Sequence, residues 1–234
     1  SFINEFLSAM TEIIIRNSGT LDKYLGDAVM AFWGAPIEVK DHAYNACLTA
    51  LQMQEKLVEM REKWSTSGET PIRIRIGINT GEVIVGNIGG EKRFDYTVLG
   101  DDVNLASRLE GANKEYGTNI MISDSTLECC KDKILVRELD IIRVKGKNEP
   151  TKVFELISIT GDKRAEEAIE KMDFYFQGLD LYRHRSFEPA MDYFKRSVEK
   201  LGDYPSRVYM KRCEFYLSSP PGDDWDGVFK MKTK

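Results

Sequence analysis

The sequence predicts a mixed α/β fold, an α+β sandwich followed by an extension that is entirely helical. Helical and strand periodicities alternate over the first part of the chain, and only helical periodicity follows. The 234 residues are 42% hydrophobic and 30% charged, which is typical of a globular protein with a buried core. Interleaved helices and paired strands favour one sheet with helices on one face. We therefore expect a domain at residues 1–159 and a helical extension at residues 160–234.

The first third of the domain predicts a helix, a β-hairpin and a longer helix. Apolar residues recur at helical spacing from Phe2, and Asn17-Ser18-Gly19 supplies a stop. Two short apolar runs meet at Gly26-Asp27, a pair that is common in turns between strands. The expected elements are a helix at residues 2–16, strands at 21–25 and 28–33, and a helix from residue 41 to about residue 64.

The rest of the domain predicts more strands and one further helix. Ile alternates with Arg up to Ile78, and Asn79-Thr80-Gly81-Glu82 then predicts a turn, so we expect a second hairpin here. Gly117 marks the end of a helix that begins at Asp102. The expected elements are hairpin strands at residues 72–78 and 83–88, a strand at 96–99, a helix at 102–116, and strands at 120–122, 134–144 and 151–157.

The extension predicts helices at residues 166–182, 187–201 and 206–217. Several of its residues resemble the pattern of a tetratricopeptide repeat, namely Ala190, Phe194, Val198, Pro205 and Tyr209. One or two such units cannot bury a core alone, since roughly three are needed. We therefore expect the extension to pack on the domain or on sequence outside this chain.

Composition excludes several classes of partner. A net charge of −5 gives no basic surface for nucleic acid, because such binding depends on clustered Lys and Arg. No apolar stretch approaches the roughly 20 residues of a bilayer helix, so we expect no membrane contact in this chain. Cys47, Cys129, Cys130 and Cys213 form no C-x-x-C pair, which favours a reduced, cytoplasmic setting. The chain begins at Ser1, so we expect it to be cut from a longer protein, with room for an upstream membrane or sensor region.

Asn104 and Arg108 are the first candidates for chemistry. They lie four residues apart on a predicted helix, so both side chains project from one face. An amide beside a guanidinium suits a sugar-phosphate. By spacing alone, a helix whose solvent face happens to carry Asn and Arg is the favoured interpretation.

Three segments resemble the signature motifs of class III adenylyl and guanylyl cyclases. They occur in the order found in that family, and the resemblance as a whole covers residues 1 to about 158. The segments are LDKYLGDAVMAF at residues 21–32, RIGINTG at 75–81 and FDYTVLGDDVNLASRL at 94–109. The resemblance implies a ferredoxin-like βαββαβ core.

The resemblance also implies the roles of single residues. Asp27 matches one of two aspartates that hold a pair of divalent cations, Mg²⁺ or Mn²⁺. Lys23 and Thr97 match the pair that reads adenine, with Thr97 typical of one subclass of adenylyl cyclases. Guanylyl cyclases carry an acidic residue at the position of Lys23, so its presence favours ATP. The remaining matches are Asn104 to the ribose, Arg108 to the α-phosphate, and Arg75 and Lys145 to the β- and γ-phosphates.

The implied reaction is the conversion of ATP to 3′,5′-cyclic AMP and pyrophosphate. The family builds each site across a head-to-tail homodimer, with Asp27 and Arg75 from one chain and the other candidates from its partner. The family's first strand, with the second metal aspartate in a Phe-x-Asp-Ile-x-Gly-Phe-Thr type motif, is expected upstream of Ser1. On these residues alone we therefore expect little or no turnover. A guanylate cyclase, an inactive nucleotide-binding regulator and an interaction module remain as alternatives.

Overall fold

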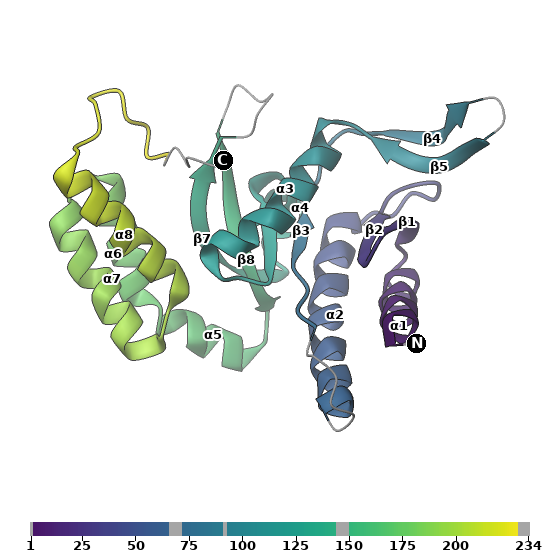
Figure 1. Cartoon of the computed structure of the whole chain (residues 1–234), viewed down its shortest axis with the longest axis horizontal. Coiled ribbons are helices and arrows are strands. Elements are labelled where there is room, and N and C mark those ends of the chain that lie inside the picture. The colour runs from purple at the N-terminus through teal and green to yellow at the C-terminus, as the bar shows by residue number, and fades with distance from the viewer. Residues whose placement is uncertain (1, 66–71, 91–92, 144–149, 229–234) are drawn as a thin grey trace.

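The computed structural model describes residues 2–65, 72–90, 93–143 and 150–228. The largest sheet of the described residues has four strands. In Figure 1 it lies in the middle of the molecule, with α1 and α2 to its right and the helical extension to its left. The mixed α/β fold predicted from the sequence is confirmed. The elements are α1 (Phe2–Arg16), β1 (Thr20–Leu25), β2 (Ala28–Phe32), α2 (His42–Ser65), β3 (Ile76–Ile78), β4 (Ile84–Gly90), β5 (Arg93–Leu99), α3 (Asp101–Tyr116), β6 (Ile120–Ser123), α4 (Asp124–Cys130), β7 (Ile134–Ile142), β8 (Thr151–Ile159), α5 (Lys163–Glu170), α6 (Asp173–Arg183), α7 (Phe187–Leu201) and α8 (Tyr204–Ser218).

The central sheet has the strand order β3-β6-β8-β7. β3 runs parallel to β6, and β8 is antiparallel to β6 and β7. Cys47 of α2 shares a core cluster with Ile120 and Ile122 of β6. Met121, between those isoleucines, instead shares a cluster with Leu109 of α3. Because neighbouring strand residues point to opposite faces, α2 and α3 cover the two faces of the sheet.

The expectation of one sheet with helices on one face is therefore wrong in both respects. The strands in the described residues form three sheets, because β1 pairs only with β2, and β4 only with β5. The central strands carry apolar residues on both faces, as the neighbours Val153 and Phe154 of β8 show. Each face therefore needs its own helical layer.

The first predicted hairpin is confirmed, since β1 and β2 pair antiparallel around Gly26-Asp27. The second predicted hairpin is wrong: β3 pairs with β6, and β4 pairs with β5. α3 lies so close to β3 that a Cβ on Gly77 would be 2.1 Å from the carbonyl oxygen of Ala106. This packing of α3 on β3 keeps β3 in the central sheet, where its backbone pairs with β6. The turn at residues 79–82 leads the chain away into β4.

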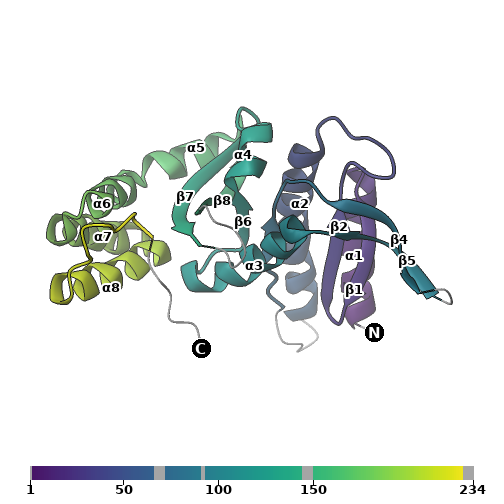
Figure 2. The same ribbon diagram turned by 90° about the horizontal axis from the view of Figure 1, so that it is seen from above.

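β4 and β5 form an arm that projects from the domain (Figures 1 and 2). Large apolar side chains on this arm are exposed, with 72% exposure for Ile84, 62% for Phe94 and 51% for Leu99. A two-stranded hairpin is only marginally stable alone. The arm thus presents an apolar surface suited to contact with another protein surface.

Helices α1, α2 and α3 agree with their predicted bounds to within one residue at each end. Gly117 closes α3 with a left-handed φ of 65°. The short helix α4 was not predicted. The Ser123 side chain caps it by accepting a hydrogen bond from the Thr126 backbone N–H. A helix of so few residues leaves too little apolar periodicity in the sequence to detect.

The extension contains α5 to α8. The helix predicted at residues 166–182 is two helices, separated at Lys171-Met172, so that prediction is wrong. The helix predicted at residues 187–201 is confirmed as α7, and the one predicted at 206–217 lies within α8. No helix in the described part of the chain combines the length and apolarity needed to cross a bilayer.

The extension has its own aromatic core and also docks on the domain. Tyr175, Phe194 and Tyr209 are buried in one cluster. The hydroxyl of Tyr209 donates to the carbonyl of Leu139 in β7 at 2.6 Å. That of Tyr175 donates to the carbonyl of Glu138 in β7 at 2.8 Å. α6 and α8 are thereby attached to the outer strand of the central sheet.

Candidate active site

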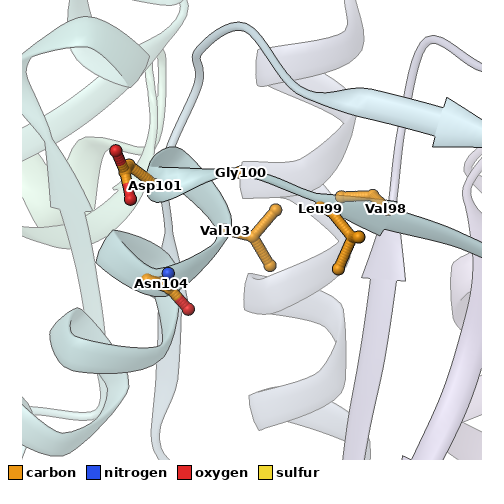
Figure 3. A pocket seen from close by; sticks show the side chains of 6 residues that line it. All are labelled: Val98, Leu99, Gly100, Asp101, Val103 and Asn104. Atoms are coloured by element: carbon orange, nitrogen blue, oxygen red, sulfur yellow. The ribbon is translucent and has the colours of Figure 1, made fainter.

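A cavity of about 360 Å³ lies where β5 ends and α3 begins (Figure 3). In Figure 3, Asp101 and Asn104 lie on the helix side of this cavity, and Val98 and Leu99 on the strand side. The first turn of a helix presents backbone N–H groups that no residue of the helix accepts, and these favour negative charge. One of the predicted candidates, Asn104, therefore borders a cavity at the N-terminus of α3, where the first turn also carries the acidic residues Asp101 and Asp102. The lining residues are Val98, Leu99, Gly100, Asp101, Val103 and Asn104.

α3 holds two predicted candidates on one exposed face. Asn104 and Arg108 are exposed, one helical turn apart, while Leu105 and Leu109 are buried beneath them. The close contact at Gly77 fixes the helix against β3. The predicted common face of Asn104 and Arg108 is thus present, on a helix with little freedom to move.

Lys23 and Thr97 come from different sheets and meet at one residue, Asp22. The Thr97 hydroxyl donates to Asp22 Oδ2 at 2.6 Å. The Lys23 ammonium lies 3.4 Å from Asp22 Oδ1. The Asp22 side chain is fully buried, whereas 38% of the Lys23 side chain is exposed. The structure therefore brings the two predicted base-reading residues together through a shared carboxylate.

Asp27 lies exposed at the turn between β1 and β2. Gly26 beside it has a left-handed φ of 67°, which a glycine adopts without strain. A single exposed carboxylate suits Mg²⁺, which keeps several water ligands and takes one or two carboxylates beside substrate phosphates. Within the described residues, no group of three His, Cys, Asp or Glu side chains has the arrangement of a metal centre. Asp27 is therefore an exposed carboxylate at this turn, and it is the residue that the sequence predicts as a metal ligand.

Arg75 lies just before β3, and its Nε donates to Glu110 of α3 at 2.9 Å. Both side chains are nearly half exposed. Among the hydrogen bonds and ion pairs of the described residues, Arg75 pairs with Glu110 and not with Lys23 or Thr97. Lys145, the other predicted phosphate contact, lies outside the described residues.

Asp22 is the residue that the sequence interpretation missed. It lies directly before Lys23 in the first motif. The one signal in the sequence that could have indicated a buried carboxylate was its position in a short apolar strand. Its burial depends on an irregularity in the pairing of β1 with β2, which no local pattern announces.

Comparison with known proteins identifies relatives of the domain. The profile of the family described as "Adenylate and Guanylate cyclase catalytic domain" matches residues 1–158. "Adenylate cyclase 1" of Rhizobium meliloti is 35% identical over 168 residues, covering 72% of this chain and 25% of that protein. "Adenylate cyclase, terminal-differentiation specific" of Dictyostelium discoideum is 35% identical over 218 residues, covering 91% of this chain and 10% of that protein. The second match therefore includes much of the helical extension, and the chain spans a quarter or less of either relative.

Solved structures with the same fold include cyclases of both specificities. The adenylyl cyclase CyaB from P. aeruginosa has a TM-score of 0.63 at 37% identity, covering 69% of this chain and 83% of that chain. The guanylyl cyclase Cya2 has a TM-score of 0.63 at 35% identity, covering 69% and 81%. Overall similarity therefore leaves the choice of base to the residues of the site.

Proposed function

Because the chain belongs to the adenylate and guanylate cyclase catalytic domain family, we propose that it converts ATP to 3′,5′-cyclic AMP and pyrophosphate. The observation that carries the choice of ATP is the cluster of Lys23 and Thr97 around Asp22. A cationic donor at this position suits an unprotonated ring nitrogen of adenine. The named adenylate cyclases among the relatives support the same choice.

The chemistry needs no protein nucleophile. The ribose 3′-oxygen forms a bond to the α-phosphorus, the bond from that phosphorus to the β-phosphate oxygen breaks, and the 3′-hydroxyl proton leaves to solvent. Asn104 would orient the ribose beside the cavity. Arg108 would stabilise the charge that develops on the α-phosphate, an effect of a few kcal/mol. Arg75 and Lys145 would contact the β- and γ-phosphates.

Asp27 would hold divalent cations, Mg²⁺ or Mn²⁺, at the triphosphate. When bound, these ions supply positive charge at the phosphates and at the 3′-oxygen. The exposed turn of β1 and β2 leaves the Asp27 carboxylate open to such a ligand.

The proposal includes a head-to-tail homodimer with two equivalent sites. Asp27 and Arg75 of one chain would meet Lys23, Thr97, Asn104, Arg108 and Lys145 of the other, and a two-fold axis would generate the second site. The exposed apolar side chains on the β4–β5 arm support an interface of this kind.

We further propose the division into a catalytic domain at residues 1–159 and a tetratricopeptide-like extension at residues 160–234, acting in the cytoplasm. The separate aromatic core of the extension supports the division. The four cysteines are free, which accords with a reducing compartment.

The direct test is to incubate the full protein that contains this chain with ATP or GTP and either metal ion, and to separate the products chromatographically. We expect cyclic AMP from ATP and much less cyclic GMP from GTP. Arg108→Ala should lower the rate by roughly 10²–10³-fold. Lys114→Ala, which removes an equal charge from an exposed position on the same helix, should leave the rate unchanged. Nucleotide binding without any product would instead identify a regulator.

A further inference from the structure

Asp22 is a fully buried carboxylate with an incomplete set of partners. Its Oδ2 accepts from the Thr97 hydroxyl at 2.6 Å and from the Val98 backbone N–H at 3.4 Å. Its Oδ1 is buried and accepts no hydrogen bond, although the Lys23 ammonium lies 3.4 Å away. A buried carboxylate needs its charge compensated. Lys23 is the cation placed to do this.

The backbone of β1 is irregular at this residue. Leu21 pairs with Ala31 and Lys23 with Met30, so Asp22 is an extra residue in β1. In a regular strand, neighbouring side chains point to opposite faces. A β-bulge re-aims a side chain, and here it allows Asp22 and Lys23 to approach each other.

The Thr97 hydroxyl has one proton and two lone pairs. Because its proton is donated to Asp22, Thr97 offers only a lone pair to any further partner. The Lys23 ammonium offers only donors. The cluster therefore holds one donor, on the partly exposed Lys23, and one acceptor, on Thr97, which is 6% exposed in the single chain.

Adenine and guanine differ in this respect at their exocyclic groups. Adenine carries an amino group, a donor, where guanine carries O6, an acceptor. A Thr97 hydroxyl limited to accepting matches the adenine amino group and opposes guanine O6. A Thr97 hydroxyl free to rotate would accept either base.

We propose that Asp22 is a specificity-determining positioning residue, which makes the base site select adenine by holding the proton of the Thr97 hydroxyl. The inference rests on the proposed function only in taking Lys23 and Thr97 as the base site. Asp22 itself does not touch the nucleotide. It acts through Thr97, with Lys23 stabilising its charge.

The test measures dissociation constants of ATP and GTP with Mg²⁺ for the full protein, which requires no turnover. Asp22→Asn keeps the shape, but its amide can donate to Thr97 and release the hydroxyl proton. We expect this variant to lower the preference for ATP on the order of tenfold. Thr97→Val should lower the preference as well. The double variant should show the same preference as Thr97→Val, because Asp22 acts through Thr97.

Two outcomes would overturn the inference: additive effects of the two substitutions, or an Asp22→Asn variant that weakens the binding of both nucleotides equally. Either would show that Asp22 only connects β1 to β5 structurally. The matched control is Asp41→Asn, which breaks the exposed pair of Asp41 with Lys133 and removes the same charge. It should leave the preference unchanged. Circular dichroism and the unfolding midpoint of each variant establish that it is folded.

A second measurement needs no substitution at Asp22. Purine riboside triphosphate lacks only the amino group of ATP, so it should bind the wild type more weakly than ATP, and Thr97→Val should remove the difference. Equal binding of the two by the wild type overturns the inference, as does a wild type that binds neither ATP nor GTP or does not distinguish them. If the wild type prefers ATP but makes no cyclic nucleotide, the proposed function is wrong and the inference about Asp22 still holds.

Discussion

Arg212 of α8 donates to the Asp140 carboxylate of β7 at 2.7 Å, and both side chains are about 95% buried. Arg212 also donates to the hydroxyl of Tyr116 at 3.0 Å. Tyr116 is the last residue of α3, the helix that carries Asn104 and Arg108. The extension is thereby attached to the helix on which the candidate site is built.

Arg212→Met should destabilise the protein by about 3–5 kcal/mol, because it leaves Asp140 buried without its cation. Asp140→Asn should be costly for the converse reason. The double variant should lose less than the sum of the two, since no unpaired charge is left. Urea unfolding of the four proteins measures these free energies, and additive losses would contradict the coupling.

Gly77→Ala should disturb the candidate site. The added Cβ would lie 2.1 Å from the carbonyl oxygen of Ala106 and 2.3 Å from the backbone nitrogen of Glu110, so α3 would have to move. Both the unfolding midpoint and the cyclase rate should fall. Gly111→Ala on the same helix is the control: a Cβ there meets nothing within 4 Å, and the variant should gain up to about 1 kcal/mol in stability.

Mixing two inactive variants should restore activity if each site is shared. Asp27→Asn and Arg108→Ala would each disable both sites of their own homodimers. A heterodimer of the two would keep one intact site. An equal mixture should therefore reach roughly a quarter of the wild-type rate, given random exchange of subunits. A mixture as inactive as its components would count against sites that span two chains.

The β4–β5 arm should contribute to the homodimer. Phe94→Ser removes a large side chain that is 62% exposed in the single chain. Dimerisation should weaken by about tenfold or more, with a matching loss of activity at low protein concentration. Leu217→Ser, at an exposed apolar position in α8, should change neither. Sedimentation velocity over a concentration series distinguishes these outcomes.

The thiols should differ in reactivity according to burial. Cys129 is exposed, whereas Cys47 and Cys213 are buried. Burial raises the pKa of the Cys213 thiol to about 12, so at neutral pH this group stays protonated and unreactive. A hydrogen bond with Cys130, together with burial, also raises the pKa of Cys47.

An aromatic disulfide reagent should accordingly label Cys129 rapidly, and Cys129→Ser should remove this phase. Labelling of Cys213 should begin only when α8 separates from its core. Separation removes the burial that raises the thiol pKa, so labelling should accelerate as the pH rises towards the ordinary thiol value of about 8.5. In the Cys129→Ser background, Arg212→Met should speed the labelling of Cys213. Rapid labelling of Cys213 in the otherwise unchanged protein would contradict the burial of this face of α8.

The sequence by itself determined the features that depend on local periodicity. The helix that ends at Gly117, and with it the common face of Asn104 and Arg108, follows from the 3.6-residue repeat and a glycine stop. The first hairpin follows from two apolar runs around Gly26-Asp27. The family motifs supplied the roles of these residues, because their order and spacing are properties of the chain alone.

Only the tertiary structure decided which distant segments meet. The turn at residues 79–82 predicted a hairpin of the strands on either side of it. β3 instead pairs with β6, because α3 packs on β3 and holds it in the central sheet. Asp22 contacts Thr97 across two sheets at the point where the register of β1 against β2 shifts. Arg212 and Asp140 lie 72 residues apart, and no local pattern pairs them. Burial and charge compensation depend on what the fold brings together, and no local pattern contains that information.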